Sequence, residues 1–350
     1  MPVAVRHPVK LPVCIGSVLD VHLLEKHWQR ITLVTIALLP LSVLFAVLSW
    51  LRRTAYASGL LRRVRLPLPV VVVGNLSVGG TGKTPVVVWL VDALRRRGFR
   101  PGVVSRGYRG AEEVTAVAAD TSPEIGGDEA VLIARRAQCP VWVGRDRSAA
   151  ALQLIAANPD VNVIVSDDGL QHYRLQRDCE LVVINARQRF GNRLLLPAGP
   201  LREPVSRLRT VDAVIVNGAS MPDLPNETFD MRLEGDAFCN LVDPARTASP
   251  SDFEGLRLHA VAGIGDPERF FSHLRRLGLS FTAHPFPDHH AFRLQDLDFS
   301  DADAVLMTQK DAIKCARFAC KNWWALPVEA RIDDALTDLV IRKIGSDIGH

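Results

Sequence analysis

Residues 70–85 read VVVVGNLSVGGTGKTP. Four consecutive valines are typical of a strand that is buried on both faces, and a glycine-rich turn follows them directly. Glycines permit the positive φ angles with which main-chain N–H groups converge on phosphate oxygens at the start of a helix. Lys83 is then expected to pair with the β- and γ-phosphates and Thr84 to bind Mg²⁺, while Pro85 suits the first helical turn. The stretch therefore predicts a nucleotide-binding phosphate loop.

This loop departs from the standard pattern G-x-x-x-x-G-K-[ST], because Ser77 stands at the first glycine position. A purely structural glycine-rich turn is the alternative. The context favours the phosphate loop, since a buried strand precedes it and apolar residues in helical spacing follow between positions 87 and 94. The residues expected to form the phosphate cradle are Gly79, Gly80, Thr81, Gly82, Lys83 and Thr84.

The length and composition of the chain indicate a folded protein of more than one domain. Its 350 residues are 48% hydrophobic and 23% charged, and the net charge is only +4. A group of basic residues follows one apolar stretch: Arg52, Arg53, Arg62, Arg63 and Arg65. Their position favours a surface facing anionic lipid over a nucleic-acid groove, with ordinary solvated charge as the alternative. Six cysteines without a C-x-x-C pair are typical of reduced cytosolic thiols, and we expect no structural metal.

The apolar stretch, residues 31–51, carries no charged side chain and would span about 30 Å as a helix. A cleaved signal peptide is disfavoured, because arginines and a nucleotide site that needs cytosolic ATP follow the stretch. A buried core helix remains an alternative. Pro40 lies in the middle of the stretch, so a helix lying in one leaflet is as consistent with the sequence as a full span. In either case we expect attachment to a membrane.

The order of expected elements predicts an α/β fold. Strands and helices alternate after the basic segment, as in a P-loop-type, doubly wound, mostly parallel sheet. We expect an N-terminal membrane-anchoring helix and basic segment over residues 1–65 and a nucleotide-binding domain over 66–228. A hairpin linker is expected over 229–246, followed by a second, smaller α/β domain over 247–350.

Acidic residues at strand and helix ends are candidates for chemistry. Asp167 and Asp168 follow an apolar strand, at the edge where ligands bind in open α/β sheets, and they can hold Mg²⁺. A helix N-cap is the alternative for such an aspartate. Asp128 follows two glycines at a helix start, and His289 and His290 lie in a loop of the second domain; a carboxylate polarised by a histidine would serve as a base. Arginines suited to phosphate recognition are Arg106, Arg109, Arg145, Arg147, Arg189, Arg193 and Arg202.

In chain order, the apolar helix and the motifs GNLSVGGTGKTP, SRGYRG, GGDEA, SDDGLQH, LLLPAGPLREP, FPDHH and TQKDAIK resemble the tetraacyldisaccharide 4'-kinase family of Gram-negative bacteria. The resemblance extends over about residues 38–316. It implies transfer of the γ-phosphate of ATP, with Mg²⁺, to the 4'-hydroxyl of a membrane-borne tetraacylated glucosamine disaccharide 1-phosphate. The product implied is lipid IVA, formed at the cytosolic face of the inner membrane. Neither a nucleic acid nor an obligate protein partner is implied.

The resemblance also assigns roles to residues. The P-loop lysine and threonine fall on Lys83 and Thr84, the Mg²⁺-associated carboxylates on Asp167 and Asp168, the base on Asp128, and its partner histidine on His289. Substrate-binding residues are expected at Arg106, Tyr108, Gln171 and His172. Two positions depart from the family pattern, since Arg109 replaces a glycine and Gln309 replaces a glutamate.

Other classes of protein were compatible with a P-loop alone. A soluble GTPase or a carboxylate-activating ligase is one alternative, although residues 308–311 (TQKD) have the wrong order for a guanine-reading N/T-K-x-D element. A membrane tether that binds nucleotide without turnover is another.

Overall fold

Two β-sheets form the framework of the protein, which is described by a computed structural model over residues 26–107 and 113–345. The larger sheet has nine strands in the order β15 (Glu329–Arg331), β8 (Thr228–Glu234), β7 (Ala213–Asn217), β6 (Cys179–Asn185), β1 (Val70–Gly74), β5 (Val163–Asp167), β2 (Pro101–Ser105), β4 (Val141–Val143) and β3 (Thr115–Val117). The seven strands from β8 to β4 run parallel, and the edge strands β15 and β3 are antiparallel to their neighbours. This confirms the predicted doubly wound, mostly parallel sheet.

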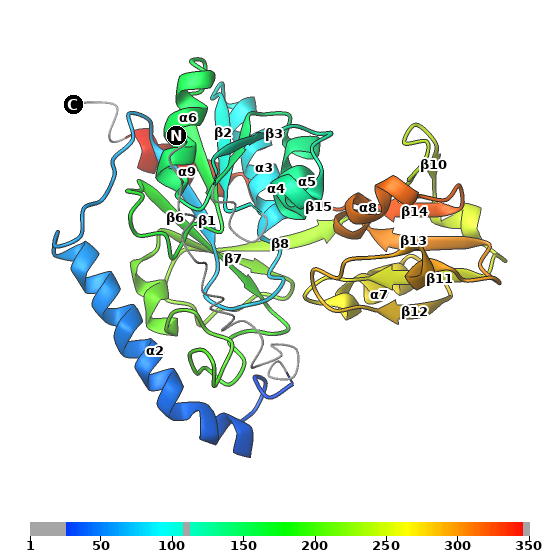
Figure 1. Ribbon diagram of the computed structural model, residues 1–350, viewed down its shortest axis with the longest axis horizontal. Coiled ribbons are helices and arrows are strands. Elements are labelled where there is room, and N and C mark those ends of the chain that lie inside the picture. The colour runs from blue at the N-terminus through cyan, green and yellow to red at the C-terminus, as the bar shows by residue number, and fades with distance from the viewer. Residues whose placement is uncertain (1–25, 108–112, 346–350) are drawn as a thin grey trace, which may run out of the picture.

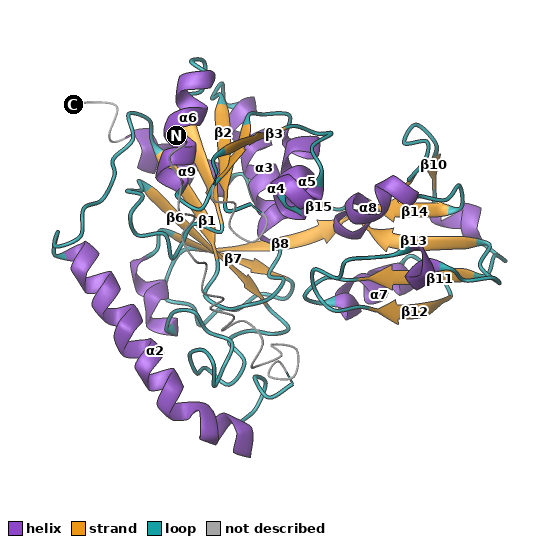
Figure 2. Cartoon of the chain, in the orientation of Figure 1, coloured by secondary structure: helices purple, strands orange, loops and turns teal. Residues whose placement is uncertain are grey.

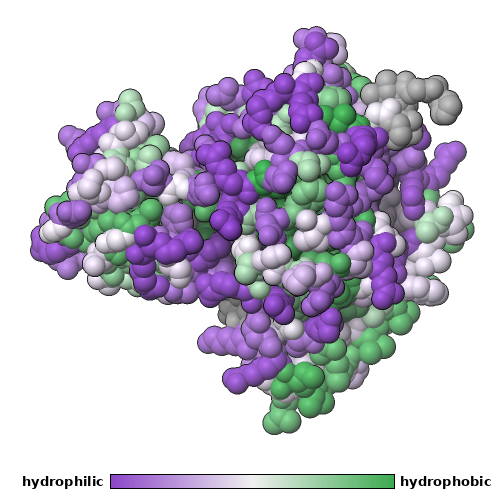
Figure 3. All heavy atoms as spheres, turned by 180° about the vertical axis from the view of Figure 1, so that it is seen from behind, coloured by the Kyte–Doolittle hydropathy of each residue, from purple (hydrophilic) through white to green (hydrophobic). Residues whose placement is uncertain are grey.

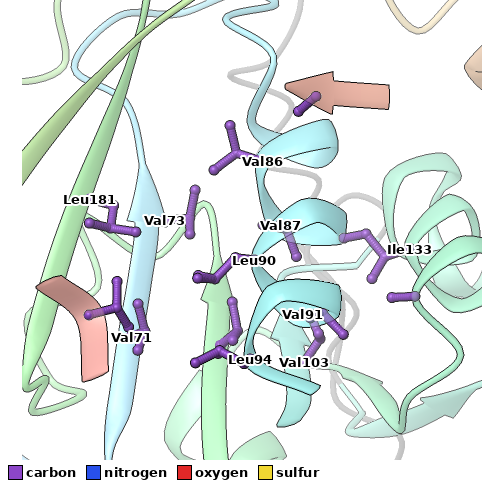
Figure 4. Close-up of a cluster of buried hydrophobic side chains, with 14 of the residues drawn as sticks. Val71, Val73, Val86, Val87, Leu90, Val91, Leu94, Val103, Ile133 and Leu181 are labelled. Atoms are coloured by element: carbon purple, nitrogen blue, oxygen red, sulfur yellow. The ribbon is translucent and has the colours of Figure 1, made fainter. Parts of the chain in front are cut away.

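Helices cover both faces of this sheet (Figure 2), which is why its central strands are rich in buried apolar residues on both faces. One face is covered by α3 (Lys83–Arg96), α5 (Asp128–Ala137) and α9 (Ala335–Gly345), and the other by α6 (Arg147–Ala157) and the 3₁₀ helix η1 (Val205–Thr210). In Figure 4, Leu90 of α3 points toward the strands while Val91 lies toward Ile133 of α5. A short helix, α4 (Pro123–Gly126), precedes α5.

The smaller sheet has six strands in the order β10 (Thr247–Ala248), β9 (Phe238–Asn240), β14 (Trp323–Leu326), β13 (Ala304–Thr308), β11 (Leu258–Ala262) and β12 (Phe281–Pro285). The last four are parallel. The helical segments between the strands of this sheet are α7 (Pro267–Arg276), α8 (Gln309–Cys315), η2 (Pro250–Phe253), η3 (Leu294–Leu297) and η4 (Ala316–Phe318). Phe271 and Leu274 of α7 lie in the core on one face of this sheet.

The expected domain boundaries need two corrections. Residues 229–246 are not a separate hairpin linker, because β8 is a strand of the larger sheet, parallel to β7, and β9 belongs to the smaller sheet. Residues 247–350 do not form one unit, because β15 pairs with β8 and α9 returns to the larger unit, where Leu336, Val340 and Ile344 are fully buried. The two units are therefore connected through a pair of strands.

The N-terminal apolar helix is α2 (Leu33–Ala57), which continues through Pro40. It lies along the outside of the larger unit, as Figure 1 shows. The hydroxyl of Ser42 donates to the carbonyl of Leu195 at 2.8 Å, and Trp28, just before the helix, donates to the carbonyl of Pro197 at 3.1 Å. Most of its apolar side chains are exposed, and Figure 3 shows hydrophobic residues gathered along this edge.

Candidate functional site

The phosphate loop connects β1 to α3 as the sequence predicts. Gly79 and Gly82 have φ angles of 106° and 97°, in the left-handed region that favours glycine, and Lys83 is the first residue of α3. Thr81 is buried and its carbonyl accepts a hydrogen bond of 2.9 Å from Nδ2 of Asn217, at the end of β7. Asn217 therefore holds the loop in shape from β7, which is separated from β1 by β6.

A turn of the smaller unit lies against this loop. Gly265 follows β11, and a Cβ atom at Gly80 would be 3.3 Å from the Gly265 Cα, while a Cβ at Gly265 would collide with the Gly80 amide nitrogen. Asp266 caps the start of α7 and accepts a 3.2 Å hydrogen bond from Asn185, at the end of β6. The smaller unit thus touches the phosphate loop backbone to backbone.

Asp168 lies beside the loop and is surrounded by cations. Its carboxylate is 3.4 Å from Nζ of Lys83 and accepts hydrogen bonds of 3.1 and 3.2 Å from Arg202, while its carbonyl accepts one of 3.1 Å from Arg147. Burial opposes ionisation, but Lys83 and Arg202 outweigh it and hold the pKa of Asp168 well below its usual range. Asp168 has a φ of 47°, in the left-handed region that few residues other than glycine adopt. Of the arginines singled out in the sequence, Arg202 thus binds the carboxylate of Asp168 and Arg147 binds its main-chain carbonyl.

Asp167, by contrast, is fully buried at the end of β5. One of its oxygens accepts a 3.0 Å hydrogen bond from Ser105, and the other, Oδ1, has no hydrogen-bond partner among the described residues. Burial, with the neighbouring charges of Glu129 and Asp168, raises the pKa of Asp167 to about 7. An unpartnered buried carboxylate oxygen next to the phosphate loop fits a cation, and Mg²⁺ commonly needs only one or two carboxylates besides phosphates. The described residues hold no cluster of three or more His, Cys, Asp or Glu side chains suited to a metal ion.

A carboxylate–imidazole pair joins the two units. Asp128 is the first residue of α5 in the larger unit, and its Oδ2 lies 3.2 Å from Nδ1 of His289, in the loop after β12 of the smaller unit. Burial would raise the pKa of Asp128, but the contact with the His289 ring and the charge of Lys310 hold it well below its usual range. The same contact raises the pKa of His289. His289 has a φ of 59°, in the left-handed region that few residues other than glycine adopt.

The TQKD segment supplies lysines to this pair. Lys310 of α8 is 3.0 Å from Glu129, 3.3 Å from Asp288 and 3.8 Å from Asp128. Lys314, one turn later, binds the buried Asp311 at 2.9 Å. In the sequence, Lys310 is only one residue of the TQKD motif. The spacing of that motif in the chain does not predict that Lys310 lies 3.8 Å from Asp128.

The expected substrate-binding residues, and the two positions that depart from the family pattern, form no hydrogen bond or ion pair with the Asp128–His289 pair or lie outside the described residues. Gln171 donates to the carbonyl of Asn75 at 3.0 Å and to Glu203 at 2.9 Å, so its amide supports the segment before the loop. His172 turns toward Asp146, with 3.7 Å between Nε2 and Oδ1, and burial together with Arg147 lowers its pKa to about 4. Arg106 is exposed at the end of β2. Tyr108 and Arg109 lie outside the described residues, and Gln309 accepts a 2.9 Å hydrogen bond from Arg136. The substrate-binding role of these residues stays a prediction.

A cleft of about 1900 Å³ lies between the units. The phosphate loop with Lys83 and Asp168 lines one side, and His289 and Lys310 line another. A triphosphate held by the loop and a hydroxyl placed at the carboxylate–imidazole pair would share this space. Such an arrangement defines a nucleotide-dependent phosphotransferase of the P-loop class.

Known proteins identify the family within this class. The family model Tetraacyldisaccharide-1-P 4'-kinase matches residues 34–345. The tetraacyldisaccharide 4'-kinases of Azoarcus sp. (strain BH72) and Aromatoleum aromaticum are both 51% identical, each covering 91% of this chain, which in turn covers 94% and 96% of theirs. The crystal structure of the "apo" form of LpxK from Aquifex aeolicus in complex with ATP matches with a TM-score of 0.73 and 30% identity, over 89% of this chain and all of the other. The chain belongs to the tetraacyldisaccharide 4'-kinase family, as its motifs predict.

Proposed function

We propose that this protein transfers the γ-phosphate of ATP to the 4'-hydroxyl of tetraacyldisaccharide 1-phosphate, giving lipid IVA in lipid A biosynthesis. Family membership supports the reaction. The structural observation that carries the proposal is the cleft whose walls include the phosphate loop of the larger unit and His289 of the smaller unit, with Asp128 3.2 Å from that histidine. Positioning and charge neutralisation are the main requirements of phosphoryl transfer, and both are present here.

The donor side is built from the phosphate loop. Main-chain N–H groups of residues 79–84 and the N-terminus of α3 bind the phosphate oxygens, and Lys83 neutralises the β- and γ-phosphates. Thr84, Asp167 and Asp168 would hold Mg²⁺, which when bound neutralises charge on the transferring phosphate. Lys83 is paired with Asp168 in the present arrangement, so nucleotide phosphates compete with that carboxylate for the lysine.

The acceptor side uses Asp128 as base. Because its pKa is held low, Asp128 is a carboxylate at physiological pH and accepts the hydrogen bond of the 4'-hydroxyl. His289 holds the same carboxylate and, with its raised pKa, shares the charge of the proton that leaves the hydroxyl. The pair is most effective when His289 is unprotonated, so activity falls as the pH drops through the pKa of the pair.

The acceptor is a membrane lipid, and α2 is suited to reach it. Thr35 and Ser42 lie on the face toward the protein, while Leu33, Leu44 and Leu48 are 85%, 55% and 57% exposed. A helix attached along the protein and apolar on its outer side is suited to lie in one leaflet, close to the plane of the membrane. We therefore place the enzyme at the cytosolic face of the inner membrane, held by α2 and the arginines that follow it.

Replacing three outward leucines of α2, in the variant Leu41→Gln/Leu44→Gln/Leu48→Gln, is expected to release the protein from anionic lipid vesicles. Each of these side chains is about half exposed in the protein. Inserting that exposed half into the membrane stabilises binding by roughly 0.75 kcal/mol per leucine, so losing three leucines lowers the partition coefficient roughly 40-fold. Vesicle sedimentation measures the partition. The matched control replaces exposed apolar residues elsewhere, Leu152→Gln/Val242→Gln/Leu256→Gln, and should bind like wild type. Equal binding of both variants would show that another surface anchors the protein.

The reaction is tested with purified full chain, γ-labelled ATP, Mg²⁺ and tetraacyldisaccharide 1-phosphate in mixed micelles. Label is expected in a more polar lipid, and chelation of the divalent cation should abolish the transfer until Mg²⁺ is restored. ATP binding without acceptor-dependent turnover would support the tether alternative and end the kinase proposal.

A further inference from the structure

The Asp128–His289 pair exists only when the two units are docked. Asp128 belongs to α5 of the larger unit and His289 to the smaller unit, so a shift of one unit against the other changes the 3.2 Å separation directly. Next to this pair, α5 of the larger unit packs against α8 of the smaller unit. Ile313 of α8 is buried in the core of the larger unit, which shows how closely α8 packs there.

Lys310 has a central place in this contact. Its ammonium group reaches from α8 to Glu129 and Asp128 of the larger unit and also to Asp288, the residue before His289. Its side chain is 15% exposed. Burial opposes its charge, but the three carboxylates outweigh this and raise the pKa of Lys310, so the cation is retained at physiological pH.

We propose that Lys310 is a positioning residue that fixes the smaller unit on α5 and thereby sets the geometry of the Asp128–His289 pair. The inference rests on the proposed function of that pair. One cation that touches both the residue bearing the base and the loop bearing its partner couples the docking of the units to the chemistry.

Two other side-chain contacts between the units do not touch both the base and the loop of its partner histidine. Arg317 of the smaller unit binds Glu124 of the larger at 2.7 Å, but both side chains are about 70% exposed, at 69% and 71%. Exposed pairs of this kind contribute about 0–1 kcal/mol to stability. Arg136 donates to Gln309 at 2.9 Å without touching the pair. Removing Lys310, by contrast, leaves the buried Asp128 beside the partly exposed carboxylates of Glu129 and Asp288 without this cation, which is unfavourable.

The charges that surround the pair come from three elements. They are Asp128 and Glu129 from α5, Asp288 and His289 from the loop after β12, and Lys310, Asp311 and Lys314 from α8. Lys310 opposes protonation of His289, whereas the carboxylates favour it. Loss of Lys310 therefore raises the pKa of the pair.

The test compares Lys310→Met, Lys310→Arg and Glu124→Gln in the full chain by steady-state kinetics across pH. For Lys310→Met we expect kcat to fall roughly 30-fold, the KM for ATP to change less than about threefold, and the acid limb of kcat to move to higher pH. Lys310→Arg should restore the acid limb and most of kcat, because it keeps the charge. Glu124→Gln, which breaks an exposed contact between the same units, should behave like wild type.

Three results would overturn the inference: an unchanged kcat in Lys310→Met, a raised KM for ATP with an unshifted acid limb, or a loss of activity that Lys310→Arg does not rescue. The second would make Lys310 a nucleotide ligand and the third a structural residue only. If Lys310→Met does not fold, the double variant Lys310→Met/Glu129→Gln, which removes one unpaired carboxylate, carries the same test.

Asp128→Asn, measured in parallel, separates the two proposals. Full activity of Asp128→Asn refutes the role of Asp128 as base. An impaired Asp128→Asn beside a fully active Lys310→Met refutes only the role of Lys310.

Discussion

Replacing Asp128 with asparagine should lower kcat about 10³-fold while ATP affinity changes less than about threefold, the range expected for loss of a general base. Asparagine has nearly the same shape but cannot take a proton. Because the charge of Asp128 raises the pKa of His289, the remaining activity should also show an acid limb at lower pH than wild type, opposite to the shift expected for Lys310→Met. Steady-state kinetics across pH and ATP titration measure both effects.

A suitable control for this substitution is Asp338→Asn on α9, since Asp338 forms an exposed pair with Arg97, 2.6 Å apart, away from the cleft. It should leave kcat and KM unchanged. Turnover of Asp128→Asn at the wild-type rate would remove Asp128 from the role of base.

Replacing Lys83 with methionine is expected to lower kcat/KM about 10²- to 10³-fold, the cost typical of removing one preorganised donor to a developing charge. The loss should appear in both kcat and the affinity for ATP, because Lys83 binds phosphates in the ground state and in the transition state. It also frees Asp168, whose carboxylate keeps only Arg202 among its side-chain partners within 3.5 Å in the described residues. Nucleotide binding by calorimetry and steady-state kinetics give the two contributions separately.

Lys343→Met is the matched control for Lys83→Met. Lys343 is also paired with an aspartate, Asp212 at 2.7 Å, but it does not line the cleft. Its replacement should have little effect on kcat/KM. If Lys83→Met retained the ATP affinity of wild type, the glycine-rich turn would have to be read as structural.

The sequence was most informative where one local pattern decides the structure. Four valines, a glycine-rich turn and an amphipathic run predict β1, the phosphate loop and α3, because each requirement is met within neighbouring residues. The start of α6 is set in the same local way, because the side chain of Asp146 caps the helix. Family motifs added Asp128 and His289 as a pair, which spacing alone could not join, since 160 residues separate them and their meeting depends on how the units dock.

What the sequence could not show depends on packing between distant segments. Asn217 looks like an ordinary polar residue at a strand end, yet it shapes the phosphate loop from β7. The segment containing β15 and α9 follows the strands of the smaller unit in the sequence. Only the pairing of β15 with β8 and the burial of α9 in the core of the larger unit show where it packs. His172 belongs to a family motif, but its ring lies 3.7 Å from Asp146 at the start of α6, where burial and Arg147 lower its pKa to about 4.

The return of α9 to the larger unit has a consequence for how the protein is made. Leu336, Leu339, Val340 and Ile344 complete the same core as Val71 of β1 and Leu90 of α3, although some 240 residues or more lie between them in the chain. During synthesis the nucleotide-binding unit therefore cannot close its core until α9 has left the ribosome, after the smaller unit has already been made. A product truncated before α9 therefore lacks part of the core that packs behind the phosphate loop, and its nucleotide-binding unit stays incomplete.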